Sequence, residues 1–220
     1  MIKTREVPTE LKNFNSVFND LTYRYDASQI FSDFLSLVIC CMAHKTQEKK
    51  YFEIINRYEK KEVDLFCRLF AELLKFYNRE IEPGFWCDPL GTYYELLAGK
   101  YKKSNFGQFF TPNGICDLMA NFTINPKEWG KTINDPASGS GRLILASNAY
   151  AEGNYYVAQD LDHTCVKMTA INMCFHRIRG EVHHMDSIRV TKPFVSYKIN
   201  HEWHKHEILN ILEFPKEQIN

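Results

Sequence analysis

The chain has 220 residues, of which 45% are hydrophobic and 25% charged, and this composition predicts a globular fold of one or two domains. No apolar run approaches the roughly 20 residues that cross a bilayer, which excludes a membrane-spanning chain and leads us to expect a cytoplasmic location. The 27 basic and 27 acidic side chains balance, whereas nucleic-acid binders usually carry an excess of Lys and Arg, so any DNA affinity is expected to be weak or shared with a partner.

The first hundred residues read as helical. The stretch up to Asp26 shows no sustained period and is expected to be partly mobile. Apolar positions at helical spacing then predict four helices. One begins at residue 28, the second covers 48–62, the third covers 62–77, and the fourth begins at residue 88. In the last of these, Asp88 is the predicted N-cap and Pro89 opens the first turn. Residues 99–104 are basic and exposed, and form either a solvated linker or a phosphate contact.

The second half alternates helices and strands. A helix is predicted from Thr111, as N-cap, and Pro112 through residue 122, with Ile115, Leu118, Met119 and Phe122 facing a sheet. Strands are predicted at 131–133, 155–159 and 181–185, with helices at 142–149 and 163–178 between them. This order implies parallel pairing of the three strands. Residues 195–199 and 208–214 are candidates for further strands, and the His-rich segment 201–206 is predicted to be a solvated helix or turn.

The stretch Asn134-Asp-Pro-Ala-Ser-Gly-Ser-Gly141 separates the first strand of this half from its helix. Its glycines allow the backbone to approach a ligand closely, and the following helix N-terminus offers unpaired N–H groups. An ordinary strand-to-helix crossover would also contain such glycines. The seven cysteines form no C-x-x-C pair and mostly stand in apolar helical stretches, which predicts buried free thiols and no metal site.

Four sequence boxes follow one another between about residues 88 and 186. They are Gly107-Gln-Phe-Phe-Thr-Pro112, the glycine-containing stretch just described, Asp160 after the second strand and Asp186 after the third. In this order they resemble the adenine-N6 DNA methyltransferases, in particular the modification subunits of type I restriction enzymes. The resemblance implies an α/β fold with a helical N-terminal subdomain (1–103) and a Rossmann-like S-adenosylmethionine-dependent methyltransferase domain (104–220). The latter is expected to be truncated or degenerate after its third strand.

The resemblance also implies a binding site for S-adenosyl-L-methionine. Asp135 would bind the amino group of the methionine moiety, and Thr111 its carboxylate. Asp160 would accept the ribose hydroxyls, with Asp162 as the competing acid, and Asp186 would accept the adenine amino group. The alternative for each acid is a helix cap or exposed loop residue, and for the aromatic pair before Thr111 a place in the core. The expected cofactor-binding residues are Phe109, Thr111, Pro112, Asp135, Pro136, Ala137, Ser138, Gly139, Gly141, Asp160 and Asp186.

One element of the family pattern is missing from this sequence. The resembling enzymes carry an Asn/Asp-Pro-Pro-aromatic tetrad that holds the target adenine, and no such tetrad follows Asp186. Residues 191–194 keep only a Pro-aromatic pair, so no catalytic residue is assigned. We therefore expect a cofactor-binding domain that does not methylate DNA alone and needs DNA plus a separate specificity or catalytic subunit. The alternative is a non-catalytic regulatory module that binds the cofactor or DNA.

Overall fold

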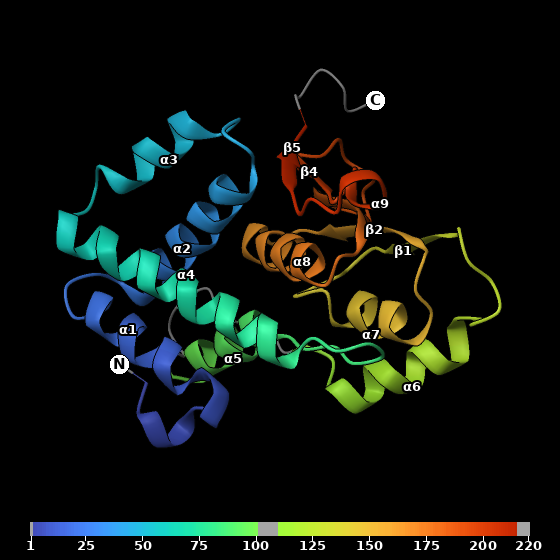
Figure 1. The fold of residues 1–220 in the computed structure, drawn as a ribbon, viewed down its shortest axis with the longest axis horizontal. Coiled ribbons are helices and arrows are strands. Elements are labelled where there is room, and N and C mark those ends of the chain that lie inside the picture. Colours follow the sequence, from blue (N-terminus) through green and yellow to red (C-terminus); the bar gives the residue numbers. More distant parts are fainter. Residues whose placement is uncertain (1, 101–109, 215–220) are drawn as a thin grey trace.

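The structure, a computed structural model, describes residues 2–100 and 110–214. Two short 3-10 turns, η1 and η2, lead into five helices in the N-terminal part (Figure 1). The bounds of these elements are η1 Thr4–Glu6, η2 Thr9–Leu11, α1 Lys12–Leu21, α2 Ala27–Met42, α3 Glu48–Ile55, α4 Lys60–Glu80 and α5 Pro89–Lys100. The helices predicted to begin at residues 28 and 88 and to cover 62–77 are confirmed as α2, α5 and α4, whereas the helix predicted over 48–62 ends already at Ile55, as α3. Asp88 caps α5 as predicted, because its Oδ1 accepts a hydrogen bond from Gly91 N at 2.7 Å.

Helix α1 corrects the expectation that the stretch up to Asp26 shows no sustained period. Four apolar side chains on one of its faces are buried, and they follow one another at spacings of three, one and three residues: Phe14, Val17, Phe18 and Leu21. This is a helical period, but ten residues are too few for it to stand out in a longer window. The helix is stabilised by tertiary contacts, since Phe14 and Phe18 pack edge to face against Tyr93 of α5.

A five-stranded mixed sheet forms the second half, in the order β1-β2-β3-β4-β5. Its strands are β1 Thr132–Asp135, β2 Tyr155–Asp160, β3 Arg179–His184, β4 Val195–Ile199 and β5 Ile211–Glu213. The pairs β1–β2 and β2–β3 are parallel, as predicted, and β4 and β5 are added antiparallel. The two candidate strands near the C-terminus are thus confirmed. The expectation that the fold is truncated or degenerate after its third strand stays a prediction.

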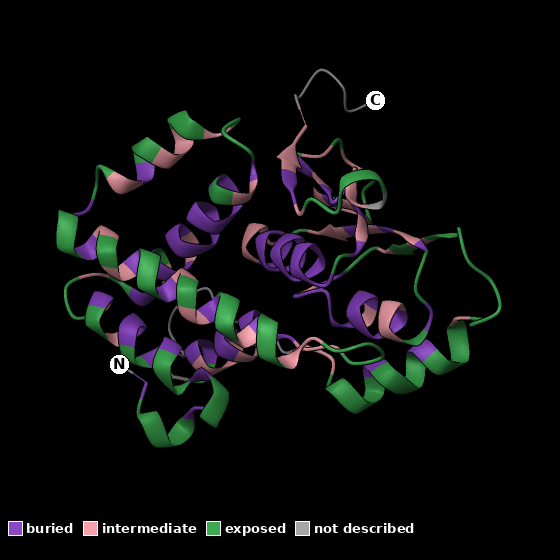
Figure 2. Cartoon of the chain, viewed as in Figure 1, coloured by how far each residue is buried: buried purple, intermediate pink, exposed green. Residues whose placement is uncertain are grey.

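Four further helices accompany the sheet: α6 Asn113–Thr123, α7 Arg142–Tyr150, α8 His163–Phe175 and α9 Trp203–His206. Helix α8 is buried over most of its surface (Figure 2). One of its sides contacts β2, β3 and β4, and the other contacts α2 and α5 of the N-terminal part. The central position suits this helix because most of its side chains are apolar, and its buried polar side chains have partners: Lys167 donates to Ser36, and Asn172 to Asp88.

A single hydrophobic cluster runs through α8 and joins the two halves of the chain. It contains Phe31 and Tyr93 from the N-terminal helices, Ile171 from α8, and Val182 and Tyr197 from the sheet. The core is therefore continuous across residue 103, and the proposed boundary between two domains there remains a prediction. No helix within the described ranges has the length and hydropathy needed to cross a membrane.

Helix α6 packs in a different orientation from the one predicted. Its small residues Cys116 and Ala120 are buried against Ala146 of α7, where small side chains allow a close approach of the two helices. The four large apolar residues expected to face the sheet are exposed instead: Ile115, Leu118, Met119 and Phe122. Thr111 is also not the N-cap, because α6 begins at Asn113 and Pro112 occupies the cap position without a side-chain hydrogen bond.

Candidate cofactor cleft

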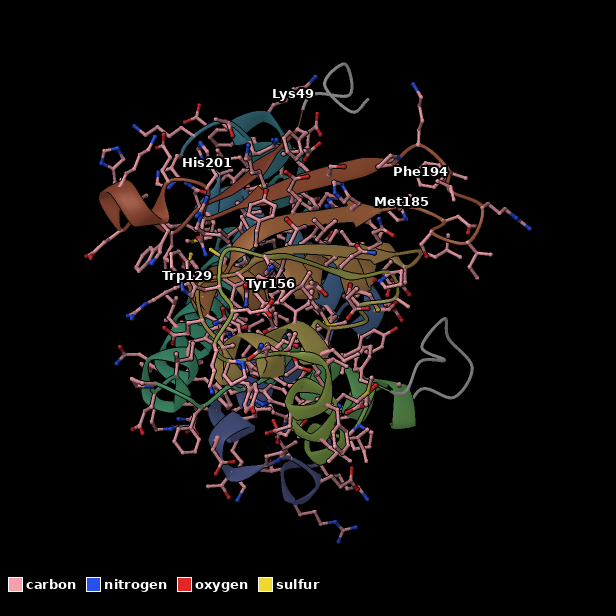
Figure 3. All side chains as sticks on the ribbon, turned by 90° about the vertical axis from the view of Figure 1, so that its right-hand side faces the viewer. Lys49, Trp129, Tyr156, Met185, Phe194 and His201 are labelled. Carbon is pink, nitrogen blue, oxygen red and sulfur yellow. The ribbon has the colours of Figure 1, made fainter. Side chains whose placement is uncertain are left out.

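A cleft of about 420 Å³ opens at the carboxyl ends of the parallel strands. Figure 3 shows this end of the sheet at the right, marked by Met185 just past β3 and Phe194 just before β4, while Trp129 and His201 mark the opposite end. The carboxyl ends of parallel strands are where α/β proteins usually bind ligands. The cleft walls come from three places: the stretch Phe110–Thr111, the glycine loop 136–141 with the start of α7, and the residues that follow β2 and β3.

The glycine loop 136–141 forms the floor of the cleft. Gly139 and Gly141 have φ angles of 56° and 93°, which glycine adopts at little cost. A Cβ on Gly139 would lie 2.8 Å from the ring of Phe110, so the opposite wall depends on this glycine. A Cβ on Gly141 would lie 3.2 Å from Thr169 of α8. The loop is therefore packed tightly from both sides, and larger side chains would displace it.

Asp160, the last residue of β2, lies on the cleft wall. Its Oδ2 accepts a hydrogen bond from Gly139 N and its Oδ1 one from Asp162 N, both at 2.8 Å. Burial raises the pKa of Asp160 above its ordinary value, and these two N–H donors oppose the rise. Each oxygen keeps a second lone pair that can accept from a ligand hydroxyl. Asp162 instead caps α8 by accepting from Thr164 N at 2.6 Å.

Asp135 ends β1 directly behind the glycine loop. Its Oδ1 accepts a hydrogen bond from Ala137 N at 3.1 Å, whereas its Oδ2 is buried and has no hydrogen-bond partner among the described residues. Burial raises the pKa of Asp135, the Ala137 N–H lowers it, and the charge of Asp160 raises it further. A buried carboxylate oxygen without a donor is costly, and it is satisfied when a ligand supplies an N–H group.

Asp186 stands two residues past β3, on the third side of the cleft. Its Oδ1 accepts from the backbone N–H groups of Ile188 and Arg189, at 3.1 and 3.0 Å, which fixes the loop in a turn. The neighbouring Ser187 Oγ donates to the carbonyl oxygen of Pro136 at 2.7 Å. This bond ties the Asp186 loop to the glycine loop across the cleft.

The cleft brings together seven of the eleven predicted site residues, namely Thr111, Pro136, Ala137, Ser138, Gly139, Asp160 and Asp186. Asp135, Gly141 and Pro112 flank the cleft without lining it, and Phe109 lies outside the described residues, as do residues 101–104 of the basic stretch. Phe110, which the sequence places in the aromatic pair beside the cofactor, lines the cleft as well. The structure adds six lining residues that the motifs did not indicate: Ser140, Arg142, Leu143, Leu161, Ser187 and Ile188. Each lies within two positions of a predicted site residue in the chain.

A second cleft, of about 470 Å³, lies on the other side of the loop that follows β3. Polar side chains of the strands line it: His183 Nδ1 lies 2.7 Å from Ser196 Oγ, and His183 Nε2 lies 3.4 Å from Glu181 Oε2. Burial lowers the pKa of His183, and the neighbouring Glu181 opposes this shift. These groups satisfy one another, whereas the first cleft has an unsatisfied buried oxygen behind its floor.

Three parallel strands with crossover helices, a glycine loop after β1 and acids at the ends of β2 and β3 define a class of α/β proteins that bind ligands at their strand ends. Within that class the chain belongs to the N-6 DNA Methylase family, whose family model matches residues 87–207. This confirms the resemblance drawn from the four boxes. The match begins within the helical half, so α5 is part of the family region.

Three relatives are methylase subunits of type I restriction enzymes. The chain is 32% identical over 100 residues to that of MpnII from Mycoplasma pneumoniae, which covers 41% of this chain and 18% of the relative. It is 26% identical to that of EcoEI from Escherichia coli (48% and 24% covered) and 23% identical to that of MjaVII from Methanocaldococcus jannaschii (51% and 20% covered). The chain thus spans only about a fifth of the length of these relatives.

Proposed function

We propose that the cleft binds S-adenosylmethionine and that the chain provides the cofactor-binding part of an adenine-N6 DNA methyltransferase. The observation that carries this proposal is the buried, unpartnered Oδ2 of Asp135 behind a glycine loop. A buried carboxylate of this kind suits an ammonium group, and the methionine tail of the cofactor has one. The cleft volume of about 420 Å³ falls within the usual range for small-molecule sites.

Three further residues fit the other parts of the same ligand. Asp160 has a lone pair available on each carboxylate oxygen for the ribose hydroxyls, as acids do at this position in dinucleotide sites. Asp186 lines the cleft and is suited to accept from the adenine amino group, since its Oδ2 has only the long, exposed ion pair with Arg189 Nη1 at 3.7 Å. Thr111 lies near the start of α6, where the helix dipole favours the negative charge of the methionine carboxylate.

The bound cofactor would supply an electrophilic methyl group, and the residues of this chain would hold and orient it. The side that binds the target adenine is not recognisable in residues 187–220, because they contain no Asn/Asp-Pro-Pro-aromatic tetrad. We infer that methylation requires further polypeptide that supplies this side, together with a subunit that selects the DNA sequence. Positioning of donor and acceptor groups supplies much of the rate of such a reaction, so half a site is not expected to be active.

Calorimetric titration with S-adenosylmethionine tests the binding proposal. The wild-type chain should bind, and Asp160→Ala should weaken binding about tenfold or more, because charged hydrogen bonds contribute roughly 1.5–3 kcal/mol. Asp64→Ala removes an exposed carboxylate of α4 and is the matched control, which should bind like the wild type. No heat and no thermal shift of the wild-type chain at saturating ligand would overturn the proposal.

Incubation with radiolabelled S-adenosylmethionine and unmethylated DNA of mixed sequence tests the inference about activity. The chain alone should transfer no label to adenine, whereas a partner that completes the site should restore transfer. Label in N6-methyladenine from the chain alone, abolished by Asp135→Ala, would contradict the inference.

A further inference from the structure

Two carboxylates of α5 and one guanidinium of α7 meet behind the cleft. Arg142 Nε donates to Asp88 Oδ2 at 2.7 Å, and Arg142 Nη2 donates to Glu95 Oε2 at 2.9 Å. The side chains of Arg142, Asp88 and Glu95 are 8%, 1% and 29% exposed. Removing such charges from water is costly, and packed apolar residues often stabilise a fold equally well. The ion pairs therefore suggest a role through their location beside the cleft, and not through the stability they add.

Asp88 connects α5 to the glycine loop. Besides Arg142, its Oδ2 accepts from Ser140 Oγ at 2.6 Å, and its Oδ1 accepts from Asn172 Nδ2 at 2.8 Å. The same Nδ2 of Asn172 donates to the Ser140 carbonyl oxygen at 2.8 Å. A Cβ placed on Gly91 would collide with both Asp88 and Ser140, so α5 packs directly against the back of the loop. The position of Ser140 is thus fixed by helices outside the cleft.

Glu95 connects α5 to the opposite wall. Its Oε1 accepts from Phe110 N at 3.0 Å, and Arg142 Nη1 donates to the Thr111 carbonyl oxygen at 3.3 Å. The guanidinium carbon of Arg142 also lies 5.4 Å from the centre of the Phe110 ring, which in turn covers Gly139. Both walls are consequently tied to one pair of carboxylates.

We propose that Asp88, Glu95 and Arg142 act as positioning residues that set the distance between the glycine loop and the Phe110–Thr111 wall of the cleft. The inference rests on the proposed function, because it assigns these residues a role in cofactor affinity. Arg142 lines the cleft, but its charge is paired with two carboxylates, and four of its five N–H groups donate to Asp88, Glu95 and the Thr111 carbonyl oxygen, which suits a positioning role better than that of an anion ligand. The helical half of the chain is thereby part of the cofactor site.

Glu95→Ala tests this role, with Glu95→Gln as the conservative variant. Glu95→Ala frees the Phe110–Thr111 wall and should weaken S-adenosylmethionine binding about tenfold at a temperature well below the melting transition. Glu95→Gln retains an acceptor for Phe110 N and should recover most of the affinity. The matched control is Asp33→Ala, which removes a buried carboxylate paired with Arg57 at 3.0 Å within the N-terminal helices. It should lower the melting temperature and leave the affinity unchanged.

Amide NMR spectra of the same variants give a readout that needs no ligand. The Gly139 and Gly141 amide signals should shift in Glu95→Ala and stay in place in Asp33→Ala, because Phe110 packs on the loop. If the wild type fails to bind the cofactor, the proposed function is wrong. The shifts of the loop signals still decide, in that case, whether the network positions the loop. If the wild type binds and Glu95→Ala binds equally, or if the loop signals do not move, the positioning role is wrong.

Discussion

At the scale of single residues, Asp135 shows how a binding position can oppose stability. The residue is half-buried, but one carboxylate oxygen, Oδ2, is fully enclosed and has no donor among the described residues. Burial raises its pKa above the ordinary value of 3.8, so the folded chain favours the protonated form more than the unfolded chain does. The ionised carboxylate therefore destabilises the chain when no ligand is bound, which is a common trade-off at functional sites.

Asp135→Asn should consequently stabilise the free chain at pH 7, by about 0.5–2 kcal/mol, while it weakens cofactor binding. The sign follows from linkage: a raised pKa in the folded state means that stability is lost as pH rises through that pKa. The stability that Asp135→Asn gains over the wild type should therefore shrink as pH falls toward 4. Urea unfolding of both proteins at pH 7 and pH 4.5 measures this. A less stable Asp135→Asn chain at pH 7 would show that Oδ2 has a partner in the free protein.

At the scale of elements, the sequence predicts the βα units well, because each strand is a short apolar or β-prone run bounded by turn residues. The parallel direction of β1, β2 and β3 follows from the alternation of strands and helices, whereas the order of the five strands and the antiparallel β4 and β5 come from the structure. Helix α1 is missed because its period lasts only ten residues, and the capping role of Thr111 is assigned one residue too early because Pro112 also fits a first turn. Periodicity marks which face of a helix is apolar and does not reveal which face is covered.

The sequence predicts the site residues that belong to recognisable motifs. It does not predict the residues that hold these motif residues in place. Asp160 and Asp186 stand after strands, where parallel strand ends meet, so their approach to one cleft follows from topology. Arg142 and Glu95 lie 47 positions apart in the chain, and nothing in either segment indicates their contact. Long-range side-chain pairs of this kind are visible only in the structure.

Helix α6 provides a test at the same scale. Phe122 is 80% exposed, so Phe122→Ser should change the free energy of unfolding by no more than about 0.5 kcal/mol. Ala120 is buried in the small-residue contact with α7, so Ala120→Leu should cost about 1–3 kcal/mol through overpacking. Thermal unfolding of the two variants makes the comparison. Equal losses from both substitutions would mean that the large apolar face is covered in the isolated chain.

At the scale of the whole molecule, charge balance limits what the chain does with DNA. With 27 basic and 27 acidic side chains, there is no general excess of cations to attract a phosphate backbone. The short basic stretch at residues 100–103 is the one place in the sequence where three lysines cluster beside the motif residues. We expect DNA binding by this chain alone to be weak and to depend mainly on that stretch.

The dependence of DNA affinity on salt concentration tests this expectation. Three phosphate contacts would give a slope of about −3 in a plot of log affinity against log salt. Replacement of Lys102 and Lys103 by Glu should remove most of the binding, whereas the same change at the exposed Lys60 and Lys61 of α4 should not. Tight, sequence-selective binding at physiological salt, or equal effects of the two double substitutions, would contradict it.

The central claim is that the cleft between the glycine loop and the Phe110–Thr111 wall is the cofactor site. A crystal structure of the chain with S-adenosylmethionine tests it most directly. We expect the methionine ammonium beside Asp135, the ribose on Asp160 and the adenine beside Asp186. Ligand density in the cleft lined by Glu181, His183 and Ser196, or no density at a saturating concentration, would contradict it.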